Sequence, residues 1–179
     1  MNTKSSRVLS ALVCLCVIIS VAFIPTTKAQ SSDSQEFISC VADFAKIVAN
    51  PGGNFALTAD IVFNNDFEPI AAFSGTLDGQ GHTISNLSIT ASTTAPTVAF
   101  IIWNSGTIKN IGFLDAEVTG TNSSKNNWAA VIAAKNTGVI ETCFVTGTIS
   151  GGYRSAGICT HNYGTIANCY AAANIEAKV

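Results

Sequence analysis

The chain has 179 residues, of which 47% are hydrophobic and only 11% are charged, and its formal net charge is −2. This length is enough for one domain, and the charge density is too low for a disordered acidic chain. No cluster of Lys and Arg favours nucleic acid or anionic lipid as a partner. The composition therefore indicates a folded module without nucleic-acid contacts.

The N-terminal segment has the order of a secretory signal peptide. Two basic residues precede an apolar run from Val8 to Ile24, and Thr27 and Ala29 then offer the small side chains of a cleavage site. We predict a signal peptide over residues 1–29 and a secreted or cell-surface location. The alternative is an uncleaved membrane anchor, because about 17 apolar residues is near the lower limit for crossing a bilayer. Without residues 1–30 the chain keeps 6 basic and 11 acidic residues, a formal charge of −5.

Residues 30–54 are predicted to form a polar linker and an N-terminal capping helix. Between Glu36 and Ala49, apolar residues recur at spacings of three and four, which predicts one apolar helix face made of Phe37, Val41, Phe44 and Val48. Pro51-Gly52-Gly53 ends the helix. Such a helix can cover the open end of a stack of strands, which would otherwise expose its core and its edges.

From Phe55 to Phe63, apolar residues alternate with polar or small ones, which predicts a strand. The segment Asp-Gly-Gln-Gly at 78–81 predicts a turn. We therefore expect residues 55–179 to form the β region of the protein.

A repeat dominates the rest of the chain. The pattern Asn-x-Gly-x-Ile begins at Asn104, Asn136 and Asn162, at offsets of 32 and 26 residues, and each copy continues in parallel. The segment from Ile84 to Ile89 is expected to be an earlier copy that lacks the Asn-x-Gly start. A constant register with loops of variable length is typical of a solenoid.

Stacking of these repeats predicts which side chains lie above one another. Successive coils about 4.8 Å apart would bury two apolar columns in one core. The first column is Ile84, Ile108, Ile140 and Ile166, and the second is Leu87, Ile111, Cys143 and Cys169. The repeat glycines, Gly106, Gly138 and Gly164, are expected to turn the chain with a positive φ. The repeat asparagines are expected to pass amide hydrogen bonds from coil to coil, with isolated Asx turns as the alternative.

The segments Ala130–Ile140 and Ala156–Ile166 resemble the GLUG motif, whose pattern is roughly Gly-Gly-Leu-Val-Gly-x-Asn-x-Gly-x-Ile. The segment Phe73–Leu87 resembles the lead-in of such proteins, so the resemblance covers about residues 36–175. GLUG-motif proteins are typically surface adhesins or accessory regions of immunoglobulin-A-cleaving metallopeptidases. The resemblance implies an all-β fold, a single-stranded right-handed parallel β-helix with a short N-terminal capping helix. The chain departs from the motif where residues such as Ala134 and Thr160 replace glycines, which implies wider corners there.

Few residues are candidates for chemistry. His82 and His161 have no second ligand at metal spacing, so we predict surface polar roles for them, and neither metal nor cofactor. Glycosidic cleavage needs two carboxylates some 5–10 Å apart, and Asp115 and Glu117 point the same way from one predicted strand. Because the matching positions of later repeats carry no acid, we predict a solvated face or a loose calcium contact, and no catalytic residue.

Four cysteines follow the signal peptide: Cys40, Cys143, Cys159 and Cys169. Cys143 and Cys169 share a predicted column, with α-carbons about 4.8 Å apart, inside the range for a disulfide. Export favours oxidation, but parallel side chains in a ladder do not naturally give the torsion of a disulfide. We favour a buried thiol ladder, with the disulfide as the alternative.

The function predicted is an exported, non-catalytic surface module for adhesion or scaffolding. Its partner would be a host or matrix glycan or protein, contacted by a strand face or by the loop 121–128. Trp128 and Tyr153 would be exposed contacts unless they pack in the core or at an edge. The alternatives are a carbohydrate-active β-helix enzyme, either a polysaccharide lyase or a glycoside hydrolase, and an accessory segment of a larger surface peptidase.

The third repeat has no obvious polar cap, so we also expect end-to-end stacking with another chain or a truncated larger product. Membrane contact is expected only through an uncleaved N-terminal segment.

Overall fold

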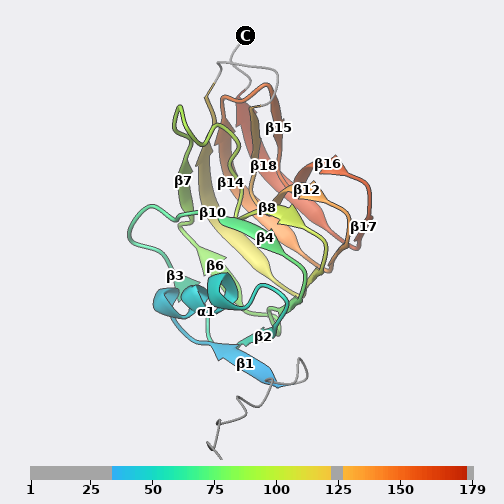
Figure 1. Ribbon diagram of the computed structural model, residues 1–179. Helices are drawn as coiled ribbons and strands as arrows, with labels where there is room; N and C mark the ends of the chain where they lie inside the picture. The colour runs from blue at the N-terminus through green and yellow to red at the C-terminus, as the bar shows by residue number, and fades with distance from the viewer. Residues whose placement is uncertain (1–33, 122–126, 177–179) are drawn as a thin grey trace, which may run out of the picture.

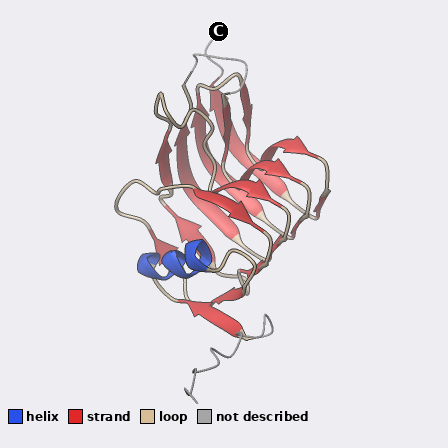
Figure 2. Cartoon of the chain, in the orientation of Figure 1, coloured by secondary structure: helices blue, strands red, loops and turns tan. Residues whose placement is uncertain are grey.

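The computed structural model of the protein describes residues 34–121 and 127–176. All strand pairs in these ranges are parallel, and the strands lie in stacked sheets, so the fold is all-β and solenoid-like, as predicted (Figures 1 and 2). The predicted signal peptide, residues 1–29, lies outside the described residues.

The strands of the described ranges belong to four sheets, which we name A to D. Sheet A contains β1 (Gln35–Ile38), β2 (Asn54–Leu57), β5 (Thr76–Asp78), β9 (Thr107–Lys109), β13 (Val139–Glu141) and β17 (Thr165–Ala167). Sheet B contains β3 (Ile61–Val62), β6 (Thr83–Ser85), β10 (Gly112–Thr119), β14 (Phe144–Ser150) and β18 (Tyr170–Glu176), with β7 (Ser88–Thr90) also paired to β10. Sheet C contains β4 (Ile70–Phe73), β8 (Ile101–Asn104), β12 (Ala133–Asn136) and β16 (Cys159–Asn162). Sheet D contains β11 (Trp128–Ala130) and β15 (Arg154–Ala156).

The order of the strands along the chain explains the stacking. From β2 onward the chain visits sheets A, B and C in turn, and in the two circuits that contain sheet D it passes through D between B and C. We call one such circuit a coil. Each complete coil adds a strand to each of the main sheets, and the coil from β5 to β8 adds two, β6 and β7, to sheet B. In sheet C, β4, β8, β12 and β16 follow one another across the molecule in chain order (Figure 1).

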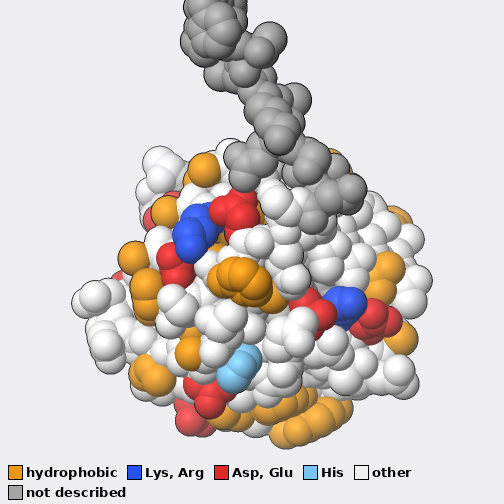
Figure 3. Space-filling view, turned by 90° about the horizontal axis from the view of Figure 1, so that it is seen from below, with side chains coloured by type: hydrophobic (Ala, Val, Ile, Leu, Met, Phe, Trp, Pro, Cys, Tyr) orange, Lys and Arg blue, Asp and Glu red, His pale blue; other side chains and the backbone are white. Residues whose placement is uncertain are grey.

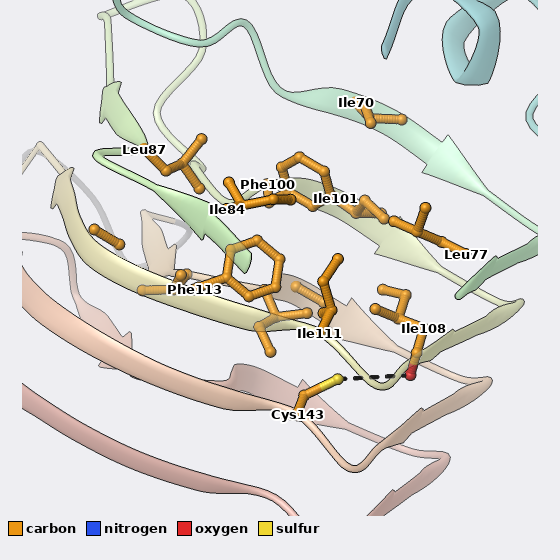
Figure 4. Packing of buried hydrophobic residues seen from close by; sticks show 14 of the residues in the cluster. Ile70, Leu77, Ile84, Leu87, Phe100, Ile101, Ile108, Ile111, Phe113 and Cys143 are labelled. Atoms are coloured by element: carbon orange, nitrogen blue, oxygen red, sulfur yellow. Dashed lines mark hydrogen bonds between the residues drawn. The ribbon is translucent and has the colours of Figure 1, made fainter. Parts of the chain in front are cut away.

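The first predicted column exists, but its lowest member was assigned wrongly. Ile108, Ile140 and Ile166 pair in register in sheet A, and the residue beneath Ile108 is Leu77. Ile84 instead pairs with Phe113 in sheet B, where Figure 4 shows it beside that ring. The true earlier copy of the repeat is therefore Phe73-Ser-Gly-Thr-Leu77, whose Ser-Gly-Thr matches residues 105–107.

The second predicted column needs the same correction. Cys143 and Cys169 directly precede the paired residues Phe144 and Tyr170, and Ile111 takes the equivalent place one coil earlier. Leu87 does not belong there, because the register of β7 with β10 places it beside Ala116. The two columns and their neighbours form one buried core, in which each fully buried aliphatic side chain contributes about 1.5–3 kcal/mol.

The repeat glycines serve close packing rather than a positive φ, contrary to prediction. Gly106, Gly138 and Gly164 are not among the residues with positive φ. A Cβ on Gly138 would lie 2.0 Å from the carbonyl oxygen of Gly106, and one on Gly164 would lie 2.1 Å from that of Gly138. Adjacent coils approach so closely at this point that only a residue without a side chain fits.

A positive φ recurs from coil to coil at another corner, where sheet A passes to sheet B. Asn110, Thr142 and Asn168 take the same place in three successive coils, with φ of 55°, 53° and 54°. Asparagine tolerates this left-handed conformation better than other non-glycine residues, whereas a β-branched side chain is strained there. Of these three positions, only position 142 carries a residue type, threonine, that is disfavoured at positive φ.

The asparagine ladder is present as predicted. The amide nitrogen of Asn104 donates to Oδ1 of Asn136, and that of Asn136 donates to Oδ1 of Asn162, both at 2.7 Å. Asn104 and Asn136 are fully buried. Each also bonds within its own turn, for example Asn136 to the carbonyl oxygen of Gly138 at 3.3 Å, so the local turn and the ladder coexist.

The N-terminal cap differs from the predicted helix over residues 36–49. Residues 35–38 form β1, a short 3₁₀ turn follows at Val41–Asp43, and only Phe44–Ala49 are α-helical (α1). Of the predicted apolar face only Phe44 is buried, since Phe37, Val41 and Val48 are exposed. Ile47 is the second buried residue of α1.

The helix nevertheless lies where a cap is expected. In the first coil, η1 and α1 occupy the path between β1 and β2 that strands of sheets B and C take in later coils. The ring of Phe44 packs on Phe63, Phe67 and Phe100 with centroids 5.5–6.0 Å apart. Seen from this end, charged side chains lie among apolar ones (Figure 3). The single strand predicted from Phe55 to Phe63 is likewise divided, because a corner separates β2 from β3.

We expect Asn136→Ala to lower the free energy of unfolding by about 2–3 kcal/mol, because it removes the shortest acceptor of the buried Asn104 amide, at 2.7 Å, and leaves that amide only its longer bonds. Asn65→Ala removes the same side chain from an exposed bend outside the ladder and should cost less than about 1 kcal/mol. Urea denaturation of both variants measures the difference. Equal losses would show that the ladder contributes no more than a surface turn.

Thr142→Asn should raise the free energy of unfolding by about 1 kcal/mol, because it relieves the strain of a β-branched residue at positive φ. Thr148→Asn is the matched control: it lies in β14 without a positive φ, and asparagine is disfavoured in strands. A gain in urea midpoint for Thr148→Asn but not for Thr142→Asn would contradict the assignment of strain to this corner.

Candidate functional site

One row of outward side chains on sheet C carries the most distinctive chemistry of the described surface. Strand pairing places Ala72, Trp103, Lys135 and His161 side by side in four successive coils. Each of these residues directly precedes a buried or ladder position, such as Asn104, so the alternation of the strands directs it outward. The sheet therefore presents an indole, an ammonium group and an imidazole at regular spacing.

Lys135 lies between two exposed aromatic rings. Its Nζ is 4.1 Å from the centroid of Trp103 and 5.3 Å from that of Tyr163, which follows the ladder residue Asn162. Trp103 is 50% exposed and Tyr163 is 71% exposed, so both rings keep free surface after contacting the lysine. Cation–π contacts of this kind contribute about 0.5–1 kcal/mol at exposed sites and hold the ammonium group in place.

Sheet D adds a second aromatic and a second cation next to this row. Trp128 of β11 pairs with Arg154 of β15, and the ring centroid of Trp128 is 3.9 Å from that of His161. The guanidinium of Arg154 contacts Nε2 of His161. We call the set Trp103, Trp128, Lys135, Arg154, His161 and Tyr163 the aromatic–cation face.

Trp128 packs against a small apolar cluster outside the main core, formed by Ala99, Ala130 and Ala134. Its indole nitrogen is buried and has no acceptor among the described residues. A buried donor without an acceptor costs about 1–3 kcal/mol, so this indole is held in place by packing rather than by hydrogen bonding.

The charge of the aromatic–cation face is opposite to that of the whole chain. The other described lysines have carboxylate partners, Lys46 with Asp43 at 2.8 Å and Lys109 with Asp78 at 3.5 Å. No carboxylate of the described residues forms an ion pair with Lys135 or Arg154. The face therefore offers two uncompensated positive charges beside exposed rings.

The imidazole of His161 responds to this environment. Burial lowers its pKa below the ordinary value of 6.5, and the positive charges of Arg154 and Lys135 lower it further. A lowered pKa in the folded state means that the unfolded chain binds the proton more readily, so this residue makes the fold less stable as the pH falls through 6.5. At neutral pH the ring is uncharged, and it can donate or accept a hydrogen bond.

The structure places the other predicted candidates apart from this face. His82 contacts Asp60, with Nδ1 3.2 Å from Oδ1, and the carboxyl of Asp60 also accepts a bond from Thr83 N that lowers its pKa. Asp115 and Glu117 are both exposed and line a shallow hollow with Gly147 and Thr148. A β-bulge between Phe113 and Ala116 displaces Asp115 from the regular strand, so the even alternation predicted for the two acids is broken.

The four cysteines of the described residues are free thiols. The sulfur of Cys143 donates to the carbonyl of Glu141 at 3.2 Å, and that of Cys169 accepts from Cys143 N at 3.3 Å, which agrees with the thiol ladder. Burial raises the pKa of Cys143 to about 12. This thiol therefore stays protonated at neutral pH and is a poor nucleophile.

Sequence reasoning found part of the face and missed the rest. Trp128 is half-buried, as predicted for packing at an edge, whereas Tyr153 is 57% exposed. The predicted contact loop 121–128 lies mostly outside the described residues. Trp103 and Lys135 were missed, although each immediately precedes the asparagine of a repeat, as His161 does. That shared repeat position was the available signal.

Two other kinds of site are absent from the described ranges. Within residues 34–121 and 127–176, no group of three His, Cys, Asp or Glu side chains is placed to hold a metal ion. No helix in these ranges is long and apolar enough to span a bilayer.

Comparison with known proteins gives one partial similarity. No protein-family model matches the chain, and no solved structure matches it. The chain is 41% identical to halomucin of Haloquadratum walsbyi (strain DSM 16790 / HBSQ001) over an alignment of 101 residues that covers 52% of this chain and 1% of halomucin. The chain thus matches only about 1% of the length of this relative. The similarity indicates a surface or extracellular protein.

We expect Arg154→Met to raise the pKa of His161 toward its ordinary value, because it removes a positive charge that opposes protonation. An NMR titration of the imidazole protons measures the shift. Lys109→Met removes a cation from sheet A and should leave the titration of His161 unchanged. If both variants moved it equally, a contact between Arg154 and His161 could not be the cause.

Proposed function

We propose that the protein is an exported surface module, a single-stranded right-handed parallel β-helix that attaches to acidic glycans through its aromatic–cation face. The observation that carries this proposal is the position of Lys135 between the exposed rings of Trp103 and Tyr163, without a carboxylate partner among the described residues. The similarity to halomucin supports a location at which such a ligand is met.

The chemistry of the face suits a sugar that carries a negative charge. An exposed aromatic ring stacks on the apolar face of a pyranose, and Trp and Tyr supply this contact area at low cost in side-chain entropy. Lys135 and Arg154 can each pair with a carboxylate or sulfate group, and the guanidinium can do so with two parallel hydrogen bonds. A neutral sugar would use the rings but leave both cations unpaired.

The geometry of the sheet favours an extended ligand. Equivalent positions on adjacent coils are about 4.8 Å apart, so the row from Trp103 to His161 spans about 10 Å, close to the length of two sugar units. The row lies on hydrogen-bonded strands rather than on loops, which fixes the spacing of its groups before a ligand arrives. An adhesive or scaffolding module needs this arrangement and no reacting group.

The test is binding of purified protein to immobilised oligosaccharides. We expect binding to oligogalacturonate or heparin fragments that weakens with added salt, and weaker binding to neutral dextran and chitin oligomers. Lys135→Met should weaken binding to the acidic ligand about tenfold, the equivalent of 1.4 kcal/mol, and Trp103→Ala should weaken it at least as much.

Two matched variants control for loss of charge and loss of an aromatic ring elsewhere. Lys109→Met lies on sheet A, and Tyr170→Ala removes a 59% exposed ring from sheet B, so neither should change binding. No binding to any glycan by the folded protein would refute the proposed function. Binding that the sheet A variant reduces as much as Lys135→Met would place the ligand on another face.

A further inference from the structure

The segment Asn86-Leu87-Ser88 has the pattern Asn-x-Ser, in which x is not proline. In exported proteins this pattern marks an acceptor for N-linked glycosylation. The sequence has the pattern at one other point, from Asn122, which lies outside the described residues. A three-residue pattern also arises by chance, so the place of Asn86 in the fold decides whether it can carry a sugar.

Asn86 lies at the corner between β6 and β7, and it is exposed. Its φ is 57°, a left-handed value that asparagine tolerates better than most residues. The backbone is fixed here, because the N–H of Asn86 donates to the carbonyl oxygen of Leu114 at 3.0 Å and Leu87 is fully buried in the core (Figure 4). A group attached to the side-chain amide would therefore extend from a fixed point of the surface.

The side-chain amide of Asn86 is not used by the fold. It has no hydrogen-bond partner among the described residues. By contrast, the amides of Asn104 and Asn136 form the ladder, and that of Asn110 donates to Asp78 at 3.0 Å. Each of those three asparagines is followed two residues later by glycine, which does not complete the acceptor pattern. The pattern thus occurs where a substituted amide breaks none of the described hydrogen bonds.

The surface beside Asn86 has room for a sugar. A hollow of about 410 Å³ is lined by Phe63, Asn64, Asn65, Asp66, Asn86 and Ser88. Ligand pockets usually measure about 300–1,000 Å³, so a sugar ring fits next to Asn86. The carboxylate and the two neighbouring amides of the lining can hydrogen-bond to sugar hydroxyls. The hollow therefore suits the first sugar of a chain attached at Asn86.

We propose that Asn86 carries an N-linked oligosaccharide that is attached during export, and this inference rests on the export proposed above. The donor is an oligosaccharide linked through a diphosphate to a membrane lipid. The amide nitrogen of Asn86 forms a bond to C1 of the first sugar, the bond between C1 and the diphosphate oxygen breaks, and the lipid diphosphate leaves with the electron pair. The amide releases one proton to solvent, so the transfer is balanced without an oxidant or a reductant.

Folding sets the time of the transfer. In the folded chain the hydroxyl of Ser88 donates to Oδ1 of Asp66 at 2.5 Å and Leu87 is buried, so a transferase cannot reach the whole pattern at once. The sugar is therefore attached before this coil closes, and it then stays exposed at the corner between two strands of sheet B. The aromatic–cation face lies on sheets C and D, so the oligosaccharide occupies a different part of the surface.

The test is translation of the full chain in the presence of microsomes that hold a lipid-linked oligosaccharide donor. Asn122→Gln is introduced first, so that Asn86 begins the one remaining acceptor pattern. We expect a glycosylated product, and peptide:N-glycosidase should convert Asn86 to aspartate, which tandem mass spectrometry locates. Asn86→Asp and Ser88→Ala should each abolish the modification, whereas Ser88→Thr should keep it, because threonine also supplies the hydroxyl.

A matched control and a separate measurement of export complete the test. Asn64→Asp removes another exposed asparagine of the same hollow, which Asp66 rather than a hydroxyl follows at the third position, so the modification should be unchanged. Protection from added protease shows whether the chain has entered the microsomes. An unmodified Asn86 in the protected chain overturns this inference and leaves the proposed export intact, whereas a chain that stays outside overturns both. Modification that persists in Asn86→Asp also overturns it, because the sugar is then attached elsewhere.

Discussion

The structure depends on in-register parallel pairing between successive coils. This pairing places each residue above its equivalent in the preceding coil, so a requirement at one point of the cross-section is repeated along the stack. The glycines at 106, 138 and 164 show the constraint most clearly, because a side chain on any of them would collide with the carbonyl of the glycine beneath. At the two buried asparagines a side chain is required instead of excluded. Each buried amide nitrogen donates to the side-chain oxygen of the asparagine in the next coil.

The same constraint positions the chemistry on the outside. A residue next to the asparagine in each repeat must face outward, and pairing aligns these residues into the row of Trp103, Lys135 and His161. No loop is needed to bring the groups together, and the buried ladder directly behind them keeps the strands from shifting. The outer row is free to vary in chemistry because it makes no contribution to the core. Its aromatic and cationic content is therefore not dictated by packing of the core.

The sequence allowed the architecture to be predicted where repeated residues were identical. The asparagine ladder and the column of Ile108, Ile140 and Ile166 were found because the Asn-x-Gly-x-Ile pattern recurs intact. Ile84 was placed wrongly because Phe73 stands where later copies have asparagine, which hid the true first copy. The helix was overextended because spacings of three and four also occur by chance in β1, where strand pairing decides the outcome. Lys135 was overlooked because its importance lies in two rings from other coils, and single-sequence patterns do not show contacts across coils.

The glycine column has a further consequence for how such a chain can change in length. A segment inserted into the stack must place a glycine and an asparagine in line with those of the neighbouring coils. The insertion that meets this condition is a whole coil of 26 or 32 residues. Partial insertions are confined to the connections between sheets B and C, which already differ between coils. Duplication of one complete circuit would lengthen the rod and extend its outer row by one side chain, while leaving every existing neighbour in place.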